Sequence, residues 1–253
     1  MRHEQTHTIG LQPPPPLDVR RHALFLDLDG TLVEFAAHPA QVVATTELRE
    51  LLANLTHAMS GAVALVTGRS IASADAVLEG VLIHIAGVHG FERRAGKATV
   101  RAGGDTSAIE RALSEARAMT ANGALEADIE DKGAALALHY RQSPGAAEAI
   151  RRAGAELAQR HGLSVLEGNM VFELTLGQRT KGDAIADFMA EPPFAGRTPI
   201  AIGDDVTDED AFAAVNAIGG ASVLVGAARA TAARFHLDGT RAVMAWLAAG
   251  LAR

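Results

Sequence analysis

The sequence contains no cysteine. This absence excludes disulfide frameworks, zinc sites built from thiolates, and enzymes with a cysteine nucleophile, among them the cysteine-based phosphatases. It is compatible with the cytosol, and we expect a cytoplasmic protein. No stretch reaches the roughly 18 uninterrupted apolar residues of a membrane helix. The N-terminal segment also lacks the apolar core of a secretory signal. The sequence therefore predicts neither a membrane segment nor a secretory signal.

The sequence also has no excess of positive charge. The formal net charge is −7 and the basic residues form no stripe, so nucleic acid is not an expected partner. The basic residues comprise twenty arginines but only three lysines. Because the planar fork of arginine does not replace a compact ammonium group, a lysine in a functional position of this chain is notable. The three are Lys97, Lys132 and Lys181.

The chain does contain enough apolar material for a large core. Hydrophobic residues make up 48% of its 253 residues and charged residues 21%, which is typical of a globular protein. The polar segment 1–17 ends in four consecutive prolines, residues 13–16. It is predicted to be a flexible tail with a polyproline II end.

Short apolar runs that end in polar turns recur in both halves of the chain. They are residues 23–26, 62–66, 81–86, 199–202 and 222–225. Runs of this kind are typical of parallel strands buried on both faces. An amphipathic helix with Thr45 at its start separates the first two runs. The pattern predicts an α/β fold, with a doubly wound, mostly parallel, Rossmann-like core.

The pattern changes between residues 105 and 177. Here the order is helix, two short strands, helix and two short strands, which suits an antiparallel sheet with two helices on one face. We therefore predict an inserted α+β domain. The predicted bounds are 1–17 for the tail, 18–104 and 178–253 for the two parts of the core catalytic domain, and 105–177 for the insertion.

Two carboxylates, Asp27 and Asp29, directly follow the first apolar run. The carboxyl ends of strands are where open α/β sheets bind their ligands. Gly30 allows a tight turn there, and Thr31 adds a hydroxyl. Two like charges this close raise one pKa unless a positive charge lies between them. The motif therefore predicts a divalent cation.

Three further polar segments are expected at the same edge of the sheet. They are Thr67-Gly68-Arg69, Lys181 at a helix start, and Asp204, Asp205 and Asp208. Oxygen ligands without thiolates or clustered histidines favour Mg²⁺. Carboxylates, an ammonium group and a hydroxyl around Mg²⁺ match a phosphoryl group. Thr207 and Asp210 are predicted to form the capping box of the following helix.

These four segments, in this order, resemble the motifs of the haloacid dehalogenase superfamily. The pentapeptide 27–31 resembles its nucleophile motif, and the inserted domain resembles its larger type of cap. Other segments are similar to trehalose-6-phosphate phosphatases in particular: residues 87–90, 131–141, 167–173 and 203–212. The resemblance covers nearly all of the chain after the prolines.

The resemblance implies a covalent mechanism. Asp27 is expected to attack phosphorus and form an aspartyl phosphate, and Asp29 to act as general acid and then general base. Thr67 and Lys181 are expected to hold the phosphoryl group. The resemblance also implies the Mg²⁺ ligands, which are Asp27, the backbone carbonyl of Asp29, and Asp204, with Asp208 behind them.

The cap is expected to bind the sugar, because charged side chains suit hydroxyls that both donate and accept hydrogen bonds. The substrate-binding residues implied by the resemblance are Glu130, Lys132, Arg141 and Glu173 on the cap, with Gly68, Arg69 and His89 on the core. The same predicted strands also carry His139, Glu167 and Asn169. The alternative interpretation is a solvated sheet face with alternating charges.

Taken together, the sequence predicts a monomeric, Mg²⁺-dependent phosphatase that hydrolyses trehalose 6-phosphate. One alternative is another sugar-phosphate phosphatase of the superfamily, for sucrose phosphate or a hexose phosphate. A second is a non-enzymatic phosphoacceptor module, which also uses Asp, Thr and Lys around Mg²⁺. Asp29 and the inserted domain argue against the second alternative, because a phosphoacceptor module needs neither.

Overall fold

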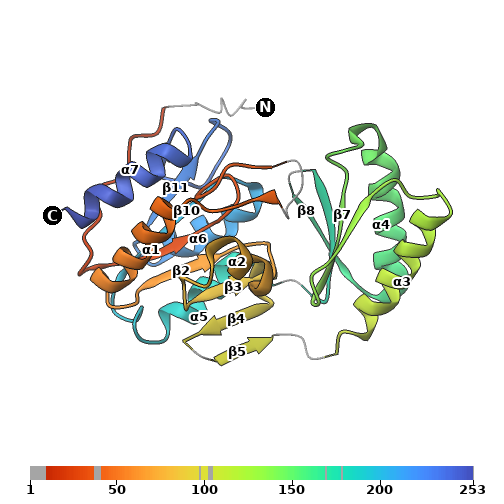
Figure 1. Cartoon of the computed structure of the whole chain (residues 1–253), viewed down its shortest axis with the longest axis horizontal. Helices are drawn as coiled ribbons and strands as arrows, with labels where there is room; N and C mark the ends of the chain where they lie inside the picture. Colours follow the sequence, from red (N-terminus) through yellow and green to blue (C-terminus); the bar gives the residue numbers. More distant parts are fainter. Residues whose placement is uncertain are drawn as a thin grey trace, which may run out of the picture.

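The computed structural model describes residues 10–36, 41–96, 98–101, 105–168, 170–177 and 179–252. Figure 1 shows two lobes: a larger one built on a sheet with helices on both faces, and a smaller one whose sheet is covered by α3 and α4 on its outer side. The smaller lobe is formed by a segment inserted into the larger lobe, so the described residues before and after it both lie in the larger lobe. This arrangement confirms the predicted fold class, an α/β core with an inserted α+β cap. The residue bounds of the domains stay a prediction.

Within the described residues, the core sheet has the strand order β12-β11-β10-β1-β2-β3-β4-β5. From β12 to β3 all neighbours are parallel, whereas β4 and β5 are antiparallel. The strands are β1 His22–Leu26, β2 Val63–Val66, β3 Ile85–Gly87, β4 Glu92–Ala95, β5 Ala98–Arg101, β10 Thr198–Gly203, β11 Ala221–Val225 and β12 Phe235–Leu237. The strand order reverses on either side of β1, so the carboxyl end of β1 is the point where such sheets bind ligands.

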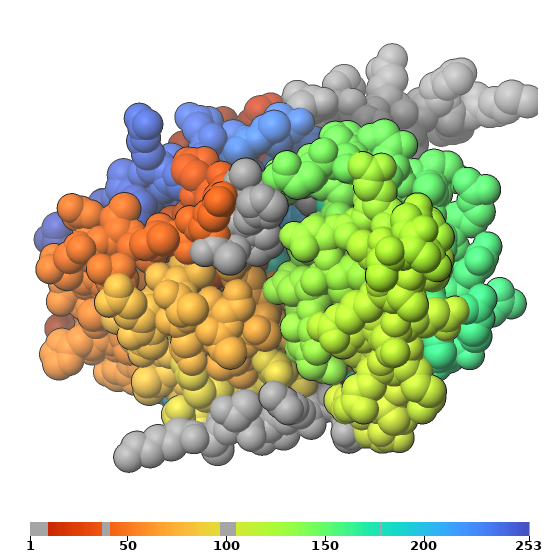
Figure 2. All heavy atoms as spheres, turned by 45° about the vertical axis from the view of Figure 1, so that its right-hand side comes forward, coloured from red at the N-terminus to blue at the C-terminus, as the bar shows by residue number. Residues whose placement is uncertain are grey.

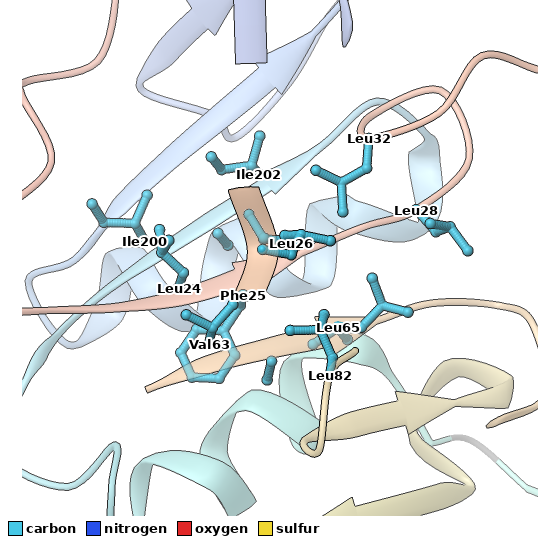
Figure 3. Packing of buried hydrophobic residues seen from close by; sticks show 14 of the residues in the cluster. Leu24, Phe25, Leu26, Leu28, Leu32, Val63, Leu65, Leu82, Ile200 and Ile202 are labelled. Atoms are coloured by element: carbon cyan, nitrogen blue, oxygen red, sulfur yellow. The ribbon is translucent and has the colours of Figure 1, made fainter. Parts of the chain in front are cut away.

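The core of the larger lobe lies on both sides of β1. Leu24 and Leu26 pair in register with Ile200 and Ile202 of β10, and Figure 3 shows these side chains together. Phe25 points to the other face, where its ring packs on the rings of Phe188 and Phe194, with centroid distances of 6.2 and 5.4 Å. The helices of this lobe are α1 Thr46–Ala58, α2 Ile71–Leu78, α5 Lys181–Met189, α6 Glu209–Ala217 and α7 Thr240–Leu251.

The second half of the predicted tail is part of the core. Leu17 is only 3% exposed and lies against Gly250 of α7. The indole nitrogen of Trp246 donates a hydrogen bond of 3.0 Å to the Pro15 carbonyl, and Gln12 forms a β-bridge with Phe235. The prediction of a flexible tail is therefore wrong for residues 12–17, where Pro15 and Leu17 contact α7 and Gln12 pairs with β12. Residues 1–9 lie outside the described residues.

The cap sheet is antiparallel and has the order β6-β7-β9-β8. Its strands are β6 Asp128–Asp131, β7 Ala135–His139, β8 Ser164–Gly168 and β9 Val171–Thr175, and its helices are α3 Ser107–Ala121 and α4 Ala147–His161. Because side chains alternate along a strand, Leu136 and Leu138 of β7 meet the helices in a second core. The alternate residues of β7 and β9 face the larger lobe. Across the described residues, we find no helix with the length and apolar character needed to span a membrane.

Candidate active site

A pocket lies between the carboxyl ends of the core strands and the open face of the cap sheet. Figure 2 shows the cap, in green, against the orange and yellow part of the core. Predicted residues from both lobes line the pocket: Asp27, Asp29, Thr67, Gly68, Arg69, His89, Lys181 and Asp204 from the core, and Glu130, Lys132, Arg141 and Glu173 from the cap. Asp208 lies next to Asp27 and Asp204. The fold thus brings all the predicted site residues together.

Asp27 is buried at the end of β1 and forms an ion pair with Lys181, the first residue of α5. The Lys181 Nζ donates to Oδ1 of Asp27 at 2.7 Å and to Oδ1 of Asp208 at 2.8 Å. Burial alone would lower the pKa of Lys181, but the two carboxylates outweigh it and raise that pKa above its ordinary value. Burial raises the pKa of Asp27 well above its ordinary range, against the effect of Lys181. The ammonium is therefore fixed beside the candidate nucleophile.

Asp204, Asp27 and Asp208 offer carboxylate oxygens that lie within 4.8 Å of one another. Oδ1 of Asp204 is buried without a hydrogen-bond partner among the described residues. Burial and the charge of Asp208 raise the pKa of Asp204 to about 7. Gly30, at φ +80°, lies so close that a Cβ there would be 2.2 Å from Asp204 Oδ2. A buried, unpaired oxygen among hard oxygen donors fits a divalent cation.

Asp208 is held from two sides. Its Oδ1 accepts from Lys181, and its Oδ2 accepts from the backbone N–H of Asp205 at 3.0 Å. Asp205 and Asp208 form the capping box of the short 3-10 helix Val206–Asp208, so the prediction of a box between Thr207 and Asp210 is wrong. The turn begins two residues earlier than predicted because Asp205, in extended conformation, is its first cap. With both oxygens engaged, Asp208 is suited to a place behind the metal ligands.

Arg229 fixes the backbone of the same loop. Its Nη2 donates to the carbonyls of Asp205 at 2.7 Å and Asp204 at 3.3 Å, and its Nη1 pairs with Glu209. The sequence offered no signal for this contact, because Arg229 lies about 25 residues after the carbonyls that it binds. It holds Asp204 in position from the core side.

Asp29 forms a bidentate ion pair with Arg69. The Arg69 Nε and Nη2 atoms each lie 2.7 Å from a carboxylate oxygen of Asp29. Burial would lower the pKa of Arg69, but the hydrogen bonds and charge of Asp29 raise it. Arg69 was predicted to contact substrate, and this role stays a prediction. In the structure its guanidinium orients the candidate acid–base group.

Thr67 and Gly68 follow β2 and bring the backbone close to the pocket. Thr67 is 1% exposed, and its Oγ1 accepts from the backbone N–H of Arg69 at 3.1 Å. A Cβ on Gly68 would lie 2.8 Å from the ring of His89, so only glycine leaves room for that ring. The turn thus depends on the hydroxyl of Thr67 and on the absence of a side chain at Gly68.

A buried cluster of charged and polar groups joins the cap to the core. The Lys132 Nζ pairs with Glu173 and donates to the Gly68 carbonyl at 2.9 Å. His89 Nε2 lies 3.1 Å from the other oxygen of Glu173. Burial would raise the pKa of Glu173, but Lys132 and His89 outweigh it and lower that pKa well below its ordinary value. His89 and its neighbour Val88 have φ values of 54° and 47°, a left-handed backbone that is strained for these residue types.

On the cap face, Glu130 is paired with His139. The His139 Nε2 lies 2.8 Å from Oε2 of Glu130. Burial would raise the pKa of Glu130, but His139 and Lys132 lower it, so the carboxylate stays charged. Glu167, in contrast, lies on the exposed side of the cap and pairs with Arg151 at 3.2 Å. Asn169 lies outside the described residues.

Several residues that line the pocket were not predicted to belong to the site, and His139 and Phe35 are two of them. His139 was placed on a predicted cap strand but not among the substrate-binding residues, although its alternation with Ala137 and Ala135 along β7 places it on the pocket face. Phe35 follows the first motif and lies under the guanidinium of Arg141, 5.2 Å from ring centroid to carbon. No periodic pattern marks Phe35, because the segment around it is neither helix nor strand.

The core fold, the cap and the buried cluster of aspartates around a lysine define a capped phosphatase of the haloacid dehalogenase type. The trehalose-phosphatase family model matches residues 25–241, and this chain belongs to that family of phosphoric monoester hydrolases. A probable trehalose-phosphate phosphatase of Sinorhizobium fredii is 43% identical over 219 residues, covering 83% of this chain and 79% of the relative. The trehalose-6-phosphate phosphatase of Escherichia coli is 40% identical over 241 residues, covering 95% and 90%.

Solved structures show the same fold. A trehalose-6-phosphate phosphatase related protein superimposes with a TM-score of 0.77 at 26% identity, covering 89% of this chain and 95% of the other. The C-terminal domain of the Candida albicans trehalose-6-phosphate phosphatase has a TM-score of 0.79 at 23% identity, covering 92% and 93%. The second likeness concerns the fold alone.

Proposed function

We propose that this chain hydrolyses trehalose 6-phosphate to trehalose and inorganic phosphate, with Mg²⁺ as its cofactor. The observation that carries the proposal is a single pocket with two halves. The core half holds Asp27, Lys181 and the unpaired Asp204 oxygen, which suit a phosphoryl group with a cation. The cap half holds Glu130 and Lys132, which suit sugar hydroxyls. Family membership and the names of the two relatives support the same substrate.

In the proposed mechanism, an Asp27 oxygen forms a bond to phosphorus while the bond from phosphorus to the sugar oxygen breaks. The sugar oxygen leaves with that electron pair and takes a proton from Asp29. Asp29 then removes a proton from water, which attacks phosphorus and restores the Asp27 carboxylate. Arg69 orients Asp29 through its two hydrogen bonds. Lys181 and Thr67 hold the phosphoryl oxygens.

The residues that would hold Mg²⁺ are Asp27, the Asp29 carbonyl and Asp204, with Asp208 behind them. When bound, Mg²⁺ supplies positive charge to the phosphoryl group in the transition state. We also propose that the protein is a cytoplasmic monomer and that it acts on a small sugar phosphate. The lack of cysteine supports the cytoplasmic setting, and membership of the family supports the small substrate.

The proposed substrate is tested by a phosphate-release screen over sugar phosphates, with Mg²⁺ and with EDTA. We expect kcat/KM for trehalose 6-phosphate to exceed that for sucrose 6′-phosphate and glucose 6-phosphate by at least about tenfold, which is an energy difference of about 1.4 kcal/mol. EDTA is expected to abolish release on every substrate. A preference for another sugar phosphate would reject trehalose 6-phosphate while leaving the phosphatase mechanism intact.

Without metal, the free energy of unfolding is expected to fall as pH rises. The pKa of Asp204 is raised to about 7 in the folded chain and is near 3.8 when unfolded. Between these values the folded state holds a proton that the unfolded state has lost, so metal-free stability falls as pH rises, by at most about 1.4 kcal/mol per pH unit for one group. Asp27 contributes with the same sign.

The measurement for this expectation is the melting temperature between pH 5 and pH 8, in EDTA and in saturating Mg²⁺. Mg²⁺ should raise the melting temperature more at pH 8 than at pH 5, because the cation competes with protons for the same carboxylates. Asp204→Asn should flatten the EDTA profile, whereas Asp238→Asn, whose side chain is 98% exposed, should leave it unchanged. A metal-free chain that becomes more stable from pH 5 to pH 7 would contradict the assignment.

A further inference from the structure

Phe35 is an unusual aromatic residue in this chain. Aromatic residues are scarce, at 4%, and all ten fall within the described residues. The others are buried or partly buried, whereas Phe35 is 42% exposed. Pockets for small molecules are lined mainly by apolar and aromatic side chains, and Phe35 exposes its ring inside such a pocket.

The backbone that precedes Phe35 forms a hydrogen-bonded turn with the first motif. The N–H groups of Leu32 and Val33 donate to the Leu28 carbonyl at 2.9 and 3.0 Å, and the Val33 carbonyl accepts from Gly30 at 2.8 Å. Leu32 and Val33 are buried in the core. The ring edge of Phe35 reaches Gly30, where a Cβ would lie 2.8 Å from Cε2. The turn before Phe35 is therefore well defined, and the exposed ring lies beside Gly30 and Asp204.

The surroundings of the ring are polar and lie on both lobes. Phe35 lines the same pocket as Glu130, His139 and Lys132 of the cap. The guanidinium of Arg141, also on the cap, lies 5.2 Å from the ring centroid. An aromatic face carries partial negative charge and attracts cations and partly positive hydrogens. One face of a pyranose ring presents a patch of C–H groups of that kind, while its edge carries the hydroxyls.

We propose that Phe35 is a specificity-determining residue whose ring forms an apolar platform for one face of the substrate's sugar. The charged cap side chains then bind the hydroxyls at the edge of that sugar, and Arg141 joins the platform to the cap. This inference rests on the proposed function and deepens it, because it names the part of the sugar that the core lobe recognises. The phosphoryl group does not take part in the contact.

The test compares Phe35→Ala and Phe35→Tyr on two substrates. One is the sugar phosphate that the wild-type protein prefers in the screen, and the other is acetyl phosphate, which has no ring to stack. Aromatic contacts of this size correspond to about a tenfold change in affinity. Phe35→Ala should therefore raise KM for the sugar phosphate about tenfold, with kcat within threefold of wild type. Phe35→Tyr, which keeps the ring, should stay within twofold.

Acetyl phosphate hydrolysis should change less than twofold in both variants. Ile218→Ala serves as the matched control, because it shortens another exposed apolar side chain, one at the end of α6 outside the pocket lining. An unchanged KM in Phe35→Ala, or an equal loss on acetyl phosphate, would overturn the platform. If the wild-type protein prefers a sugar phosphate other than trehalose 6-phosphate, the proposed substrate fails, and the platform is still tested on the preferred sugar.

Discussion

Asp27→Asn is expected to lower kcat for phosphate release by at least about 10⁴-fold, as loss of a catalytic nucleophile does in other hydrolases. The amide is nearly isosteric with the carboxylate but cannot attack phosphorus. Lys181 keeps its contact with Asp208 in the variant, so the site should remain assembled. Burial raises the pKa of Asp27, which means that the charged carboxylate is costly to bury without metal. The metal-free variant should therefore be at least as stable as the wild-type protein at pH 8.

The measurement is single-turnover phosphate release, together with calorimetric titration of the variant with trehalose 6-phosphate. Binding should persist within about tenfold of the wild-type affinity, since the cap residues and Lys181 are intact. Asp238→Asn makes the same chemical change on an exposed side chain and should keep the wild-type rate. A variant Asp27→Asn that retains more than about one per cent of the wild-type rate would reject Asp27 as the nucleophile, since a lost nucleophile costs far more.

The residues at the strand ends could be predicted from sequence because each carries a local signal. An apolar run buried on both faces is followed at once by polar residues, as at Asp27 and Thr67. The parallel pairing of β1 with β2 and β10 then places these ends at one edge. Local chain chemistry therefore determines the core half of the site.

The pairings between distant residues could not be predicted in this way. Arg69 and Asp29 are 40 residues apart, and Lys132 and Gly68 are 64 residues apart. Nothing in the spacing of charges along the chain shows which carboxylate meets which cation. The first pair depends on how β1 and β2 pair within the core, and the second depends on how the two lobes meet. They account for the site details that the sequence left open.

The strands at the sheet edges were missed for a different reason. β4 and β5 form an antiparallel hairpin, and β4 carries Glu92, Arg93 and Arg94, so it has no apolar run. β12 has only three residues. Edge strands are short and polar because one side faces solvent or a loop, and this composition hides them from a search for buried runs.

Lys132 and Glu173 of the cap line the proposed sugar site and also bind core residues. In this structure Lys132 binds a core carbonyl next to Thr67, and Glu173 binds a core histidine. Removing one partner of a buried ion pair leaves an uncompensated charge, which costs about 3–5 kcal/mol. A loss of activity in Lys132→Ala could therefore come from the sugar or from a displaced Thr67 turn. Glu130 is hydrogen-bonded to His139 of the same sheet. A substitution of Glu130 therefore tests sugar binding without removing a contact between the cap and the Thr67 turn.

Glu130→Ala is expected to lower kcat/KM for trehalose 6-phosphate by about 100-fold, because a hydrogen bond to a charged group contributes about 1.5–3 kcal/mol. Hydrolysis of p-nitrophenyl phosphate, which has no sugar hydroxyls, should fall less than about threefold, within the energy of one ordinary surface contact. Lys132→Ala should show the same preference with a larger loss on the aryl phosphate, since it also frees the Gly68 carbonyl. Glu167→Ala, an exposed cap carboxylate paired with Arg151, is the matched control and should keep wild-type rates on both substrates. Equal losses on both substrates in Glu130→Ala would remove this residue from sugar recognition, because a side chain that binds only the sugar cannot affect a substrate without one.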